Sequence, residues 1–243
     1  IVDADFTKIS NVEKFTTANG ANNLTLGTIA DGSGLATVTG GAGNDTINAS
    51  AFAGSLTIST GSGGNDTITL GTANGQINVV DATNQWDLND TFTGAAGASD
   101  VIHLVGDSQT VQDADFTNVT KIEKITTSNG TNNITLGTIA DDSLAIATIV
   151  GGTGADTINA SSYAAELTVS GGSGGDTITT QSGDYSLSVN AGGGNDTIYV
   201  TGAELSSADT VTGGAGDDTL SLADDSVTLV DAAFENISQF ENF

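Results

Sequence analysis

Apolar and polar residues alternate with a period of two in short runs along the chain. The segments SLTIST at 55–60, ELTVS at 166–170 and SLSVN at 186–190 place apolar side chains between Ser, Thr, Glu or Asn. This pattern is typical of a strand with one buried face, and it lacks the helical period of about 3.6 residues. A Gly-rich segment follows each run, and a second run such as DTI follows the glycines. The pattern therefore predicts a strand, a Gly-rich turn, a second strand and a further turn such as NASAFAG or NASSYAAE.

These strand pairs recur at a constant interval. Within each half of the chain, successive aspartates that follow the Gly-rich turns lie about 20 to 22 residues apart. Stacked coils of this length predict an all-β fold, namely a right-handed parallel β-helix or β-roll solenoid with about 20 residues per coil and the Gly-rich turns on one edge. The side chains expected inside it are Leu56, Ile58, Ile47, Leu167, Val169, Ile158, Ile178, Leu187, Val189, Ile198 and Leu220.

A second and longer period relates the two halves of the chain. The run DADFTKISNVEKF at 3–15 returns as DADFTNVTKIEKI at 113–125 and as DAAFENISQFENF at 231–243. The repeat predicts a first tandem β-helix unit at residues 1–110, a second at 111–230, and the start of a third unit or a terminal cap at 231–243. We expect one continuous solenoid, and we read the start at Ile1 as that of a segment of a larger protein.

The segment Phe6–Phe15 interrupts the pattern of Gly-rich turns. It has no glycine, and its apolar residues Phe6, Ile9, Val12 and Phe15 lie three apart. This spacing fits either one helical turn or a tight coil corner. We favour a wider, glycine-free coil that separates successive stacks of Gly-rich turns.

Acidic residues dominate the charged side chains. Thirty Asp and Glu stand against four Lys and Arg, which gives a formal net charge of −26. Such a chain repels itself when folded unless cations bind, and it cannot form the basic surface that nucleic acid requires. The absence of Cys excludes disulfides and thiolate metal sites. No apolar run is long enough to span a bilayer, so we expect no membrane insertion.

The Gly-rich turns share a nine-residue pattern, G-G-x-G-x-D-x-U-x with U a large apolar residue, which is a calcium-binding signature of β-helices. Ca²⁺ takes about six to eight oxygen ligands, so one turn cannot complete a site and neighbouring coils must share each ion. Glycine lets the backbone bend so that its carbonyls converge, and the aspartate adds a carboxylate. The copies are GGAGNDTIN at 40–48, GGTGADTIN at 151–159, GGSGGDTIT at 171–179, AGGGNDTIY at 191–199, GGAGDDTLS at 213–221 and, more loosely, GSGGNDTIT at 61–69.

The sequence thus predicts several bound Ca²⁺ ions and no other cofactor. The expected side-chain ligands are Asp45, Asp66, Asp100, Asp156, Asp176, Asp196 and Asp218. The expected backbone carbonyl ligands are those of Gly41, Gly43, Gly64, Gly152, Gly154, Gly172, Gly174, Gly192, Gly194, Gly214 and Gly216. No Gly-rich run precedes Asp90, which stays outside this set. Asn22 and Asn132 stand where the motif has Asp, so their rungs are expected to bind calcium weakly or not at all.

These turns resemble the RTX, or hemolysin-type, calcium-binding repeat family over residues 40–69 and 151–221. The resemblance implies a calcium-bound parallel β-roll in a protein exported by bacterial type I secretion. The chain departs from the usual back-to-back repeats, because it has one calcium turn per coil of about 20 residues. Together with the inserted segments that begin at Phe6, Phe116 and Phe234, this looks more like surface-layer proteins and large adhesins than like a toxin.

We expect no enzymatic activity. His103, the only histidine, lies in the alternating run VIHLV without a nucleophile motif, so a surface strand position explains it better than a catalytic triad does. A polysaccharide-cleaving β-helix would use paired carboxylates, but here the Gly-rich turns account for the aspartates and no Arg or aromatic cleft is available to hold a sugar.

The expected function is a structural calcium-binding segment of a secreted bacterial surface-layer protein at the cell surface, in which Ca²⁺ drives folding and assembly. The alternatives are a calcium-rigidified spacer of an RTX adhesin and a non-catalytic calcium module of an exported polysaccharide-modifying enzyme. The expected partners are other copies of the chain or neighbouring repeats of a larger one, and cell-surface polysaccharide.

Overall fold

The computed structural model describes residues 1–80, 86, 89–143, 146–181, 183, 185–200, 205–223 and 231–243. They form two compact units. Unit 1 comprises Ile1–Val105, Asp115–Ile125 and Ser143–Ala145, and unit 2 comprises Gly106–Ala114, Thr126–Asp142 and Ile146–Phe243. Strand β12 (Lys124–Thr127) has residues in both units. None of the helices in the described ranges has the length and hydropathy that a bilayer-crossing helix requires.

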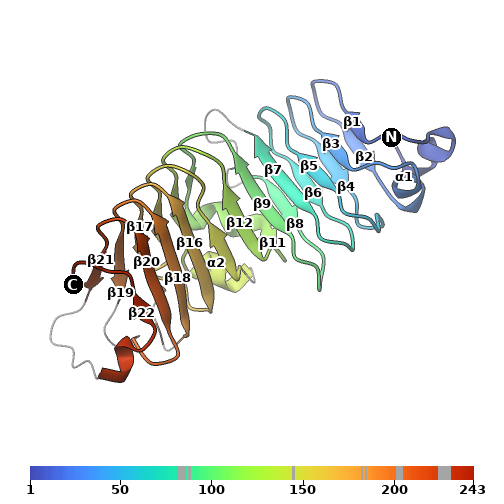
Figure 1. Cartoon of the computed structure of the whole chain (residues 1–243). Helices are drawn as coiled ribbons and strands as arrows, with labels where there is room; N and C mark the ends of the chain where they lie inside the picture. The colour runs from blue at the N-terminus through green and yellow to red at the C-terminus, as the bar shows by residue number, and fades with distance from the viewer. Residues whose placement is uncertain are drawn as a thin grey trace. The chain divides into compact units, whose positions relative to one another are not determined.

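In unit 1 the chain alternates between two parallel sheets (Figure 1). The first sheet contains, in order, β1 (Lys14–Thr16), β3 (Thr37–Thr39), β5 (Thr57–Ser59), β7 (Gln76–Val80) and β9 (Val101–Val105). The second contains β2 (Asn23–Thr25), β4 (Thr46–Asn48), β6 (Thr67–Thr69), β8 (Thr91–Thr93) and β11 (Val119–Thr120).

Unit 2 repeats this arrangement, and Figure 1 shows its longer strands side by side. One sheet contains β14 (Thr148–Val150), β16 (Leu167–Ser173), β18 (Leu187–Gly193), β20 (Thr210–Ala215) and β22 (Ile237–Ser238). The other contains β10 (Thr110–Val111), β13 (Asn133–Thr135), β15 (Thr157–Asn159), β17 (Thr177–Thr179), β19 (Thr197–Val200) and β21 (Thr219–Leu222). The fold is a parallel β-solenoid of about 22 residues per turn, which confirms the predicted fold class.

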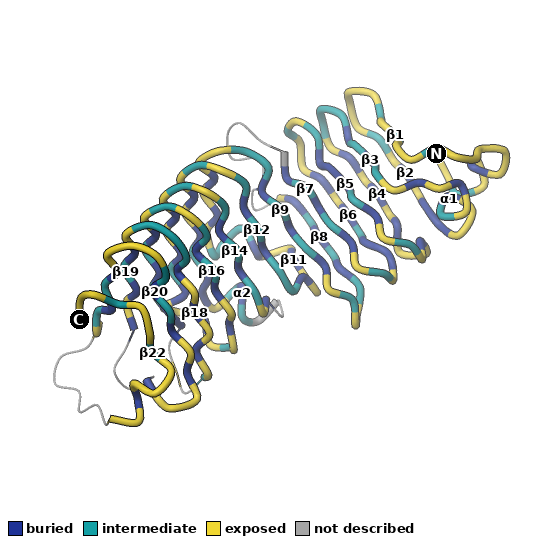
Figure 2. The backbone as a smooth tube through the Cα atoms, in the orientation of Figure 1, coloured by how far each residue is buried: buried dark blue, intermediate teal, exposed yellow. Residues whose placement is uncertain are grey.

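Equivalent apolar residues of successive coils stack on one another in the core. Val169 pairs with Val189, and Val189 pairs with Val211, because each coil repeats the same alternation in register. All eleven side chains predicted to lie inside are buried, at 3% exposure or less. Figure 2 shows the same pattern, with buried strand segments joined by exposed turns.

Short helices occupy several corners, and the sequence pattern had offered a helical turn only for the segment that begins at Phe6. The helices are η1 (Asp3–Lys8), α1 (Thr28–Gly32), η2 (Asp113–Asn118), α2 (Thr138–Ser143) and η3 (Asp231–Phe234). The glycine-free coil favoured for Phe6–Phe15 is therefore wrong for its first part, which is a 3₁₀ turn. A bend at Asn11, whose φ is 56°, leads from this turn towards β1.

An aspartate that is remote in sequence holds the first turn of each α-helix. Asp3 Oδ1 accepts hydrogen bonds from the N–H groups of Gly27 and Ala30 at 2.8 Å. Asp113 does the same for Gly137 and Ala140 in the second repeat. Burial raises the pKa of Asp3, but its hydrogen bonds with backbone N–H groups outweigh burial and hold the pKa below its ordinary value. The two helices therefore depend on contacts between coils rather than on local propensity.

Trp86 is a core residue of unit 1. It is 5% exposed, its ring meets that of Phe116 edge to face at 4.9 Å between centroids, and its Nε1–H donates to Asp115 O at 3.2 Å. Phe6, the equivalent of Phe116 in the first repeat, is also buried. Trp86 therefore contributes apolar area to the core and satisfies its indole N–H within it.

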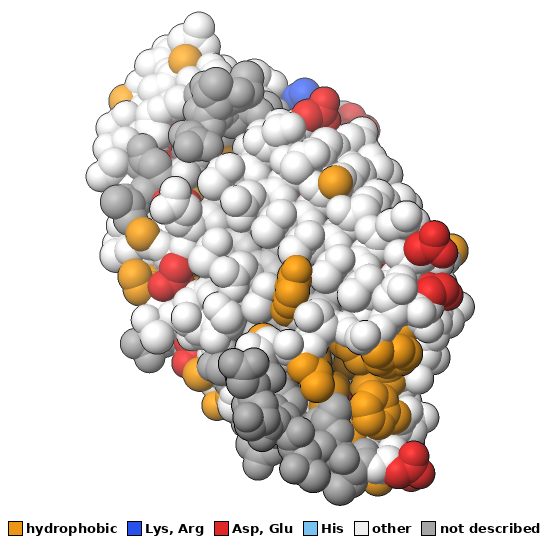
Figure 3. Space-filling view, turned by 90° about the vertical axis from the view of Figure 1, so that its left-hand side faces the viewer, with side chains coloured by type: hydrophobic (Ala, Val, Ile, Leu, Met, Phe, Trp, Pro, Cys, Tyr) orange, Lys and Arg blue, Asp and Glu red, His pale blue; other side chains and the backbone are white. Residues whose placement is uncertain are grey.

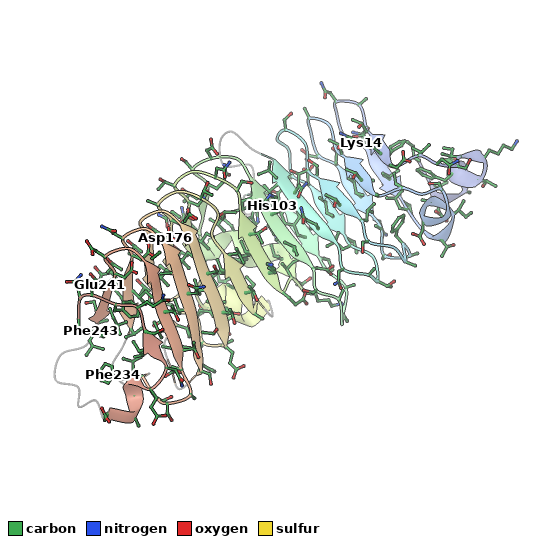
Figure 4. All side chains as sticks on the ribbon, in the orientation of Figure 1. Lys14, His103, Asp176, Phe234, Glu241 and Phe243 are labelled. Carbon is green, nitrogen blue, oxygen red and sulfur yellow. The ribbon has the colours of Figure 1, made fainter. Side chains whose placement is uncertain are left out.

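In the third copy of the repeat the equivalent aromatic residues are exposed. Phe234 is 39% exposed and Phe243 is 78% exposed, and their rings lie 6.3 Å apart (Figure 4). Figure 3 shows apolar side chains gathered on one part of this face of the molecule, while acidic side chains there are few and scattered. The motif aspartates are buried and so add no charge to the surface of this face.

The Tyr163 hydroxyl offers a test of core hydrogen bonding in unit 2. Tyr163 is fully buried and its hydroxyl donates to Ile146 O at 2.7 Å, and burial raises its pKa to about 12. The substitution Tyr163→Phe leaves that carbonyl without its donor, so we expect a loss of about 1 to 2 kcal/mol in the free energy of unfolding, measured by urea titration. The control Tyr199→Phe changes an exposed residue and should have no measurable effect. Equal losses of unfolding free energy in both variants would contradict the buried position of the Tyr163 hydroxyl.

Candidate metal centre

Buried aspartates line the corner where the chain passes from the first to the second sheet of each unit. In unit 2 these corners join β14 to β15, β16 to β17, β18 to β19 and β20 to β21. The Gly-rich turn forms the corner, and the aspartate follows it, one residue before the second strand begins. The aspartates are Asp156, Asp176, Asp196 and Asp218, each at 2% exposure or less.

One oxygen of each carboxylate belongs to a hydrogen-bonded ladder. The main-chain N–H of Asp156 donates to Asp176 Oδ1 at 2.8 Å, that of Asp176 to Asp196 Oδ1 at 2.7 Å, and that of Asp196 to Asp218 Oδ1 at 2.9 Å. Successive rungs are 20, 20 and 22 residues apart. The aspartate therefore ties each coil to the preceding one whether or not a metal is bound.

The other oxygen of these four carboxylates has no protein partner. Oδ2 of Asp156, Asp176, Asp196 and Asp218 is buried and makes no hydrogen bond. A buried charged oxygen without a partner is costly, so its position calls for a cation or a proton. A Cβ built on Gly151 would lie 2.7 Å from Asp156 Oδ2, and one on Gly213 would lie 2.8 Å from Asp218 Oδ2. Glycine at the start of the turn thus leaves room beside the unpaired oxygen.

The glycines two and four places into each turn form columns along the stack. Gly172 and Gly192 both have φ of 112°, and a Cβ on Gly192 would meet the carbonyl oxygen of Gly172. That carbonyl therefore points along the stack towards the next coil. The carbonyl of Gly152 also accepts the N–H of Ser173 at 3.1 Å, which leaves one lone pair for a further partner.

The other glycines predicted as ligands occupy the same columns. Positive φ is found at Gly43, Gly64, Gly154, Gly172, Gly174, Gly192, Gly194, Gly214 and Gly216, and Gly41 and Gly152 are the exceptions. The role of these carbonyls as calcium ligands stays a prediction. In the described part of the chain no three acidic or histidine side chains converge as a metal-binding group, so carbonyls would have to supply the remaining ligands.

In unit 1 the structure places two aspartates differently from the prediction. Asp90 lies in the ladder, since its Oδ1 accepts the N–H of Asp66 at 2.7 Å, just as Asp66 Oδ1 accepts that of Asp45 at 2.8 Å. Asp100 lies before β9, at the corner that leads back to the first sheet, and so is not a rung. Asp90 is thus a rung of the ladder and Asp100 is not, because the position in the coil decides, not the presence of nearby glycines. Whether Asp100 or Asp90 binds calcium stays a prediction.

Asp100 has its own set of hydrogen bonds. Its Oδ1 accepts the N–H of Gly75 at 2.7 Å and its Oδ2 accepts the N–H of Ala95 at 2.6 Å. Its own N–H donates to Glu123 Oε2 at 2.8 Å. Burial raises the pKa of Asp100 although both N–H groups lower it. The carboxylate is thus satisfied by the protein, as expected of a structural residue.

Residues other than aspartate adjoin the ladders at their ends. In unit 2 the N–H of Gln109 donates to Asn132 Oδ1 at 2.9 Å, so the hydrogen-bonded run continues past Asn132. Asn132 donates both its main-chain N–H and its Nδ2 to Asp156 Oδ1, each at 2.8 Å. Asn22 does the same to Asp45 Oδ1 at 2.9 and 2.7 Å. At the other end of unit 2, Glu241 Oε2 accepts the N–H of Asp218 at 2.8 Å (Figure 4). The sequence pattern identified both asparagines at the aspartate position, but it gave no indication of Glu241, which follows no Gly-rich turn.

Four stretches of the chain match the RTX calcium-binding nonapeptide repeat family, at residues 28–56, 147–162, 188–202 and 205–229. The chain carries RTX repeats. The turns of Asp45, Asp156, Asp196 and Asp218 fall within the matched stretches, and the RTX turn of Asp176 lies between two of them with the same ladder geometry. Comparisons with curated proteins and with solved structures found no match.

RTX repeats typically bind Ca²⁺, and the residues present here fit that ion. Calcium prefers carboxylate and carbonyl oxygens, which are the groups that the RTX turns bring together. The unpaired Oδ2 atoms of unit 2 supply the negative charge, and the glycine columns supply carbonyls directed along the stack. The donor set contains neither sulfur nor imidazole, in keeping with a hard cation.

Without a metal the RTX ladder carries an electrostatic strain. Burial raises the pKa of Asp176 to about 7; the N–H of Asp156 lowers it, and the carboxylates of Asp196 and Asp156 raise it further. The pKa of Asp66 in unit 1 also rises to about 7, with burial the main cause. A cation in contact with these oxygens acts in the opposite direction and favours the ionised form.

This strain predicts opposite effects of pH with and without calcium. A carboxyl whose pKa rises on folding stabilises the folded state fully below its unfolded pKa of about 3.8, and that stability is lost as pH rises through about 7. We therefore expect the melting temperature of the calcium-free protein to be lower at pH 8 than at pH 5. With saturating Ca²⁺ the difference should reverse, because calcium requires the deprotonated ligand.

The measurement is thermal unfolding in chelator-free, metal-depleted buffer, since chelators themselves change affinity with pH. The substitution Asp176→Asn removes one titrating rung and should reduce the difference between the two pH values. A calcium-free protein that gains stability from pH 5 to pH 8 would contradict the electrostatic account.

Proposed function

We propose that the protein is a structural calcium-binding segment of a secreted bacterial surface-layer protein, in which Ca²⁺ drives folding and assembly at the cell surface. The observation that carries the proposal is the run of four consecutive buried carboxylate oxygens without a partner in unit 2. The net charge of −26 supports a need for cations, and RTX repeats imply a secreted bacterial protein in general.

The residues of each turn have separate roles in this proposal. Bound Ca²⁺ supplies the positive charge and accepts about six to eight oxygens. The aspartate joins two coils through Oδ1 and offers Oδ2 to the ion. The glycines let successive turns approach closely, and the apolar residue two places after the aspartate, such as Ile178, anchors the turn in the core. Calcium then acts as part of the fold, and its binding free energy adds to the free energy of folding.

The proposed role is not catalytic. His103 (labelled in Figure 4) is half-buried in β9, where it pairs with Asn78 of β7, and the ladder aspartates are engaged with backbone N–H groups. The partners proposed are further copies of the chain or neighbouring repeats, and cell-surface polysaccharide.

Two measurements test the proposal. The first is a metal count per chain by mass spectrometry of the native protein, after dialysis against millimolar Ca²⁺ and, in parallel, against millimolar Mg²⁺. We expect several calcium ions with dissociation constants of about 10⁻⁴ to 10⁻³ M, as in extracellular modules, and little magnesium. A count of zero calcium would overturn the proposal. The second is electron microscopy after calcium addition, where ordered sheets support a surface-layer role and persistent monomers favour the adhesin spacer.

A further inference from the structure

The two units differ in how their carboxylates are satisfied. In unit 2, Oδ2 is buried and unpartnered in all four aspartates of the run from Asp156 to Asp218. In unit 1, Asp45 Oδ2 accepts the N–H of Gly41 at 3.0 Å. Among the described residues of unit 1, no aspartate has a buried Oδ2 without a partner. The buried carboxylate oxygens without a partner are therefore concentrated in unit 2.

The spacing of the glycines differs in the same way. In unit 2 the two glycine columns lie two residues apart in every turn, as in Gly172 and Gly174 or Gly192 and Gly194. In unit 1 a Cβ on Gly61 would meet the carbonyl of Gly41, and one on Gly64 would meet that of Gly43. The second turn of unit 1 therefore contains one residue more between its two glycine columns than the first. Ser62 N–H donates to Gly41 O and Gly63 O accepts the N–H of Gly43, each at 3.0 Å, whereas in unit 2 Ser173 alone makes both contacts, with Gly152 and Gly154.

The first position of the turn also differs in the second turn of unit 1, where it is Thr60, whereas the first turn has Gly40 there. Thr60 is the structural equivalent of Gly171. A Cβ added to Gly40 would meet the carbonyl of Thr60, just as a Cβ added to Gly151 would meet the carbonyl of Gly171. Thr60 brings a buried hydroxyl where glycine would leave space beside the carboxylate. In unit 2 this position is Gly in three turns and the small Ala191 in the fourth.

From these three differences we infer that the calcium of this protein is held in unit 2, in the three intervals between its four aspartate rungs, and that unit 1 keeps its fold without bound calcium. The inference rests on the proposed calcium function and locates it. It makes unit 2 a calcium-responsive element beside a calcium-independent one in the same chain. A rise in calcium outside the cell would then order unit 2 and leave unit 1 unchanged.

The chain contains a natural reporter for each unit. Its only tryptophan, Trp86, is buried in unit 1, whereas all three tyrosines, Tyr163, Tyr185 and Tyr199, lie in unit 2. Tryptophan fluorescence thus follows unit 1, and tyrosine near-ultraviolet circular dichroism, dominated by the buried Tyr163, follows unit 2.

The test is a calcium titration of the metal-depleted full-length chain with both signals recorded. We expect the tyrosine signal to change over the calcium range in which ions bind, and the thermal transition reported by tryptophan to stay within about 2 °C. Calcium shifts of the tryptophan transition as large as those of the tyrosine transition would overturn the inference. Hydrogen exchange of unit 1 and unit 2 peptides gives the same comparison without relying on the optical signals.

The number of calcium ions bound by two matched variants shows which unit holds them. Asp176 borders two of the three intervals, so Asp176→Asn should remove about two of the bound ions, whereas Asp45→Asn should remove none. Equal losses in the two variants would overturn the inference while leaving calcium binding intact. No calcium in the unsubstituted chain would overturn the proposed function itself, so the two failures are distinguishable.

Discussion

Calcium is expected to raise the melting temperature of the calcium-dependent transition by about 20 °C. At a free concentration one hundred times the dissociation constant, each site adds about 2.7 kcal/mol to stability, so three sites add about 8 kcal/mol. For a chain of this size each kcal/mol shifts the melting temperature by about 2 to 4 °C. The size of the effect follows from the buried, unpartnered Oδ2 atoms of unit 2, which the ion satisfies.

The measurement is differential scanning calorimetry of metal-depleted protein with and without Ca²⁺. Magnesium at the same concentration is the control, because its smaller ion demands octahedral geometry and retains its waters, so its shift should be a few degrees at most. An unchanged melting curve with calcium would show that the ladder needs no cation.

The substitution Gly192→Ala is expected to destabilise unit 2 by about 2 to 4 kcal/mol. Gly192 has φ of 112°, and an added Cβ would meet the carbonyl oxygen of Gly172 in the preceding coil. A side chain at such a φ costs about 1 to 3 kcal/mol, and overlap with a backbone atom of a regular stack adds to it. The variant should also bind less calcium, because the displaced carbonyl belongs to the same turn.

The neighbouring position provides a matched control. A Cβ on Gly193 has no heavy atom within 4 Å, and its partners in adjacent coils are Ser173 and Ala215, which carry side chains. Gly193→Ala should therefore change stability by less than about 0.5 kcal/mol. Urea unfolding followed by tyrosine circular dichroism measures both variants, and similar losses in the two would contradict the column geometry.

The repeating part of the fold could be predicted from sequence because one rule governs it. Alternation with a period of two assigns Ile158, Ile178 and Ile198 to the core, and a nearly constant coil length stacks them. Each local preference agrees with the global arrangement, so no tertiary information was needed.

The corners escaped prediction where tertiary contacts override local pattern. The helix α1 has only five residues, too few to form alone, and Asp3 holds its first turn from 24 residues away. The residues around Thr28 in the sequence do not include Asp3, so local pattern cannot predict this contact. The same applies to η1, whose apolar spacing fitted two geometries equally well.

The ladder could be predicted only in part, because glycine content was used to locate it. Asp90 is a rung without a Gly-rich turn before it, and Asp100 follows glycines at the opposite corner. The two kinds of corner alternate along the chain, so an aspartate can be assigned to one of them only by counting the strands that precede it. The sequence after Thr72 is irregular, and its strands could not be counted. Nor could the sequence show which Oδ2 atoms lack a partner, since this depends on register between coils.

The asparagine that precedes the first aspartate of each ladder has a consequence for how such arrays grow. Asn22 and Asn132 occupy equivalent places in two copies of the same block, and each gives two donors to the first carboxylate. Because an amide adds no negative charge, it fixes the lower boundary of a run of like charges. Duplication of this block would add further runs of aspartates, each of limited length, and would not extend a single run. The electrostatic repulsion within each run would therefore stay constant as the protein lengthens.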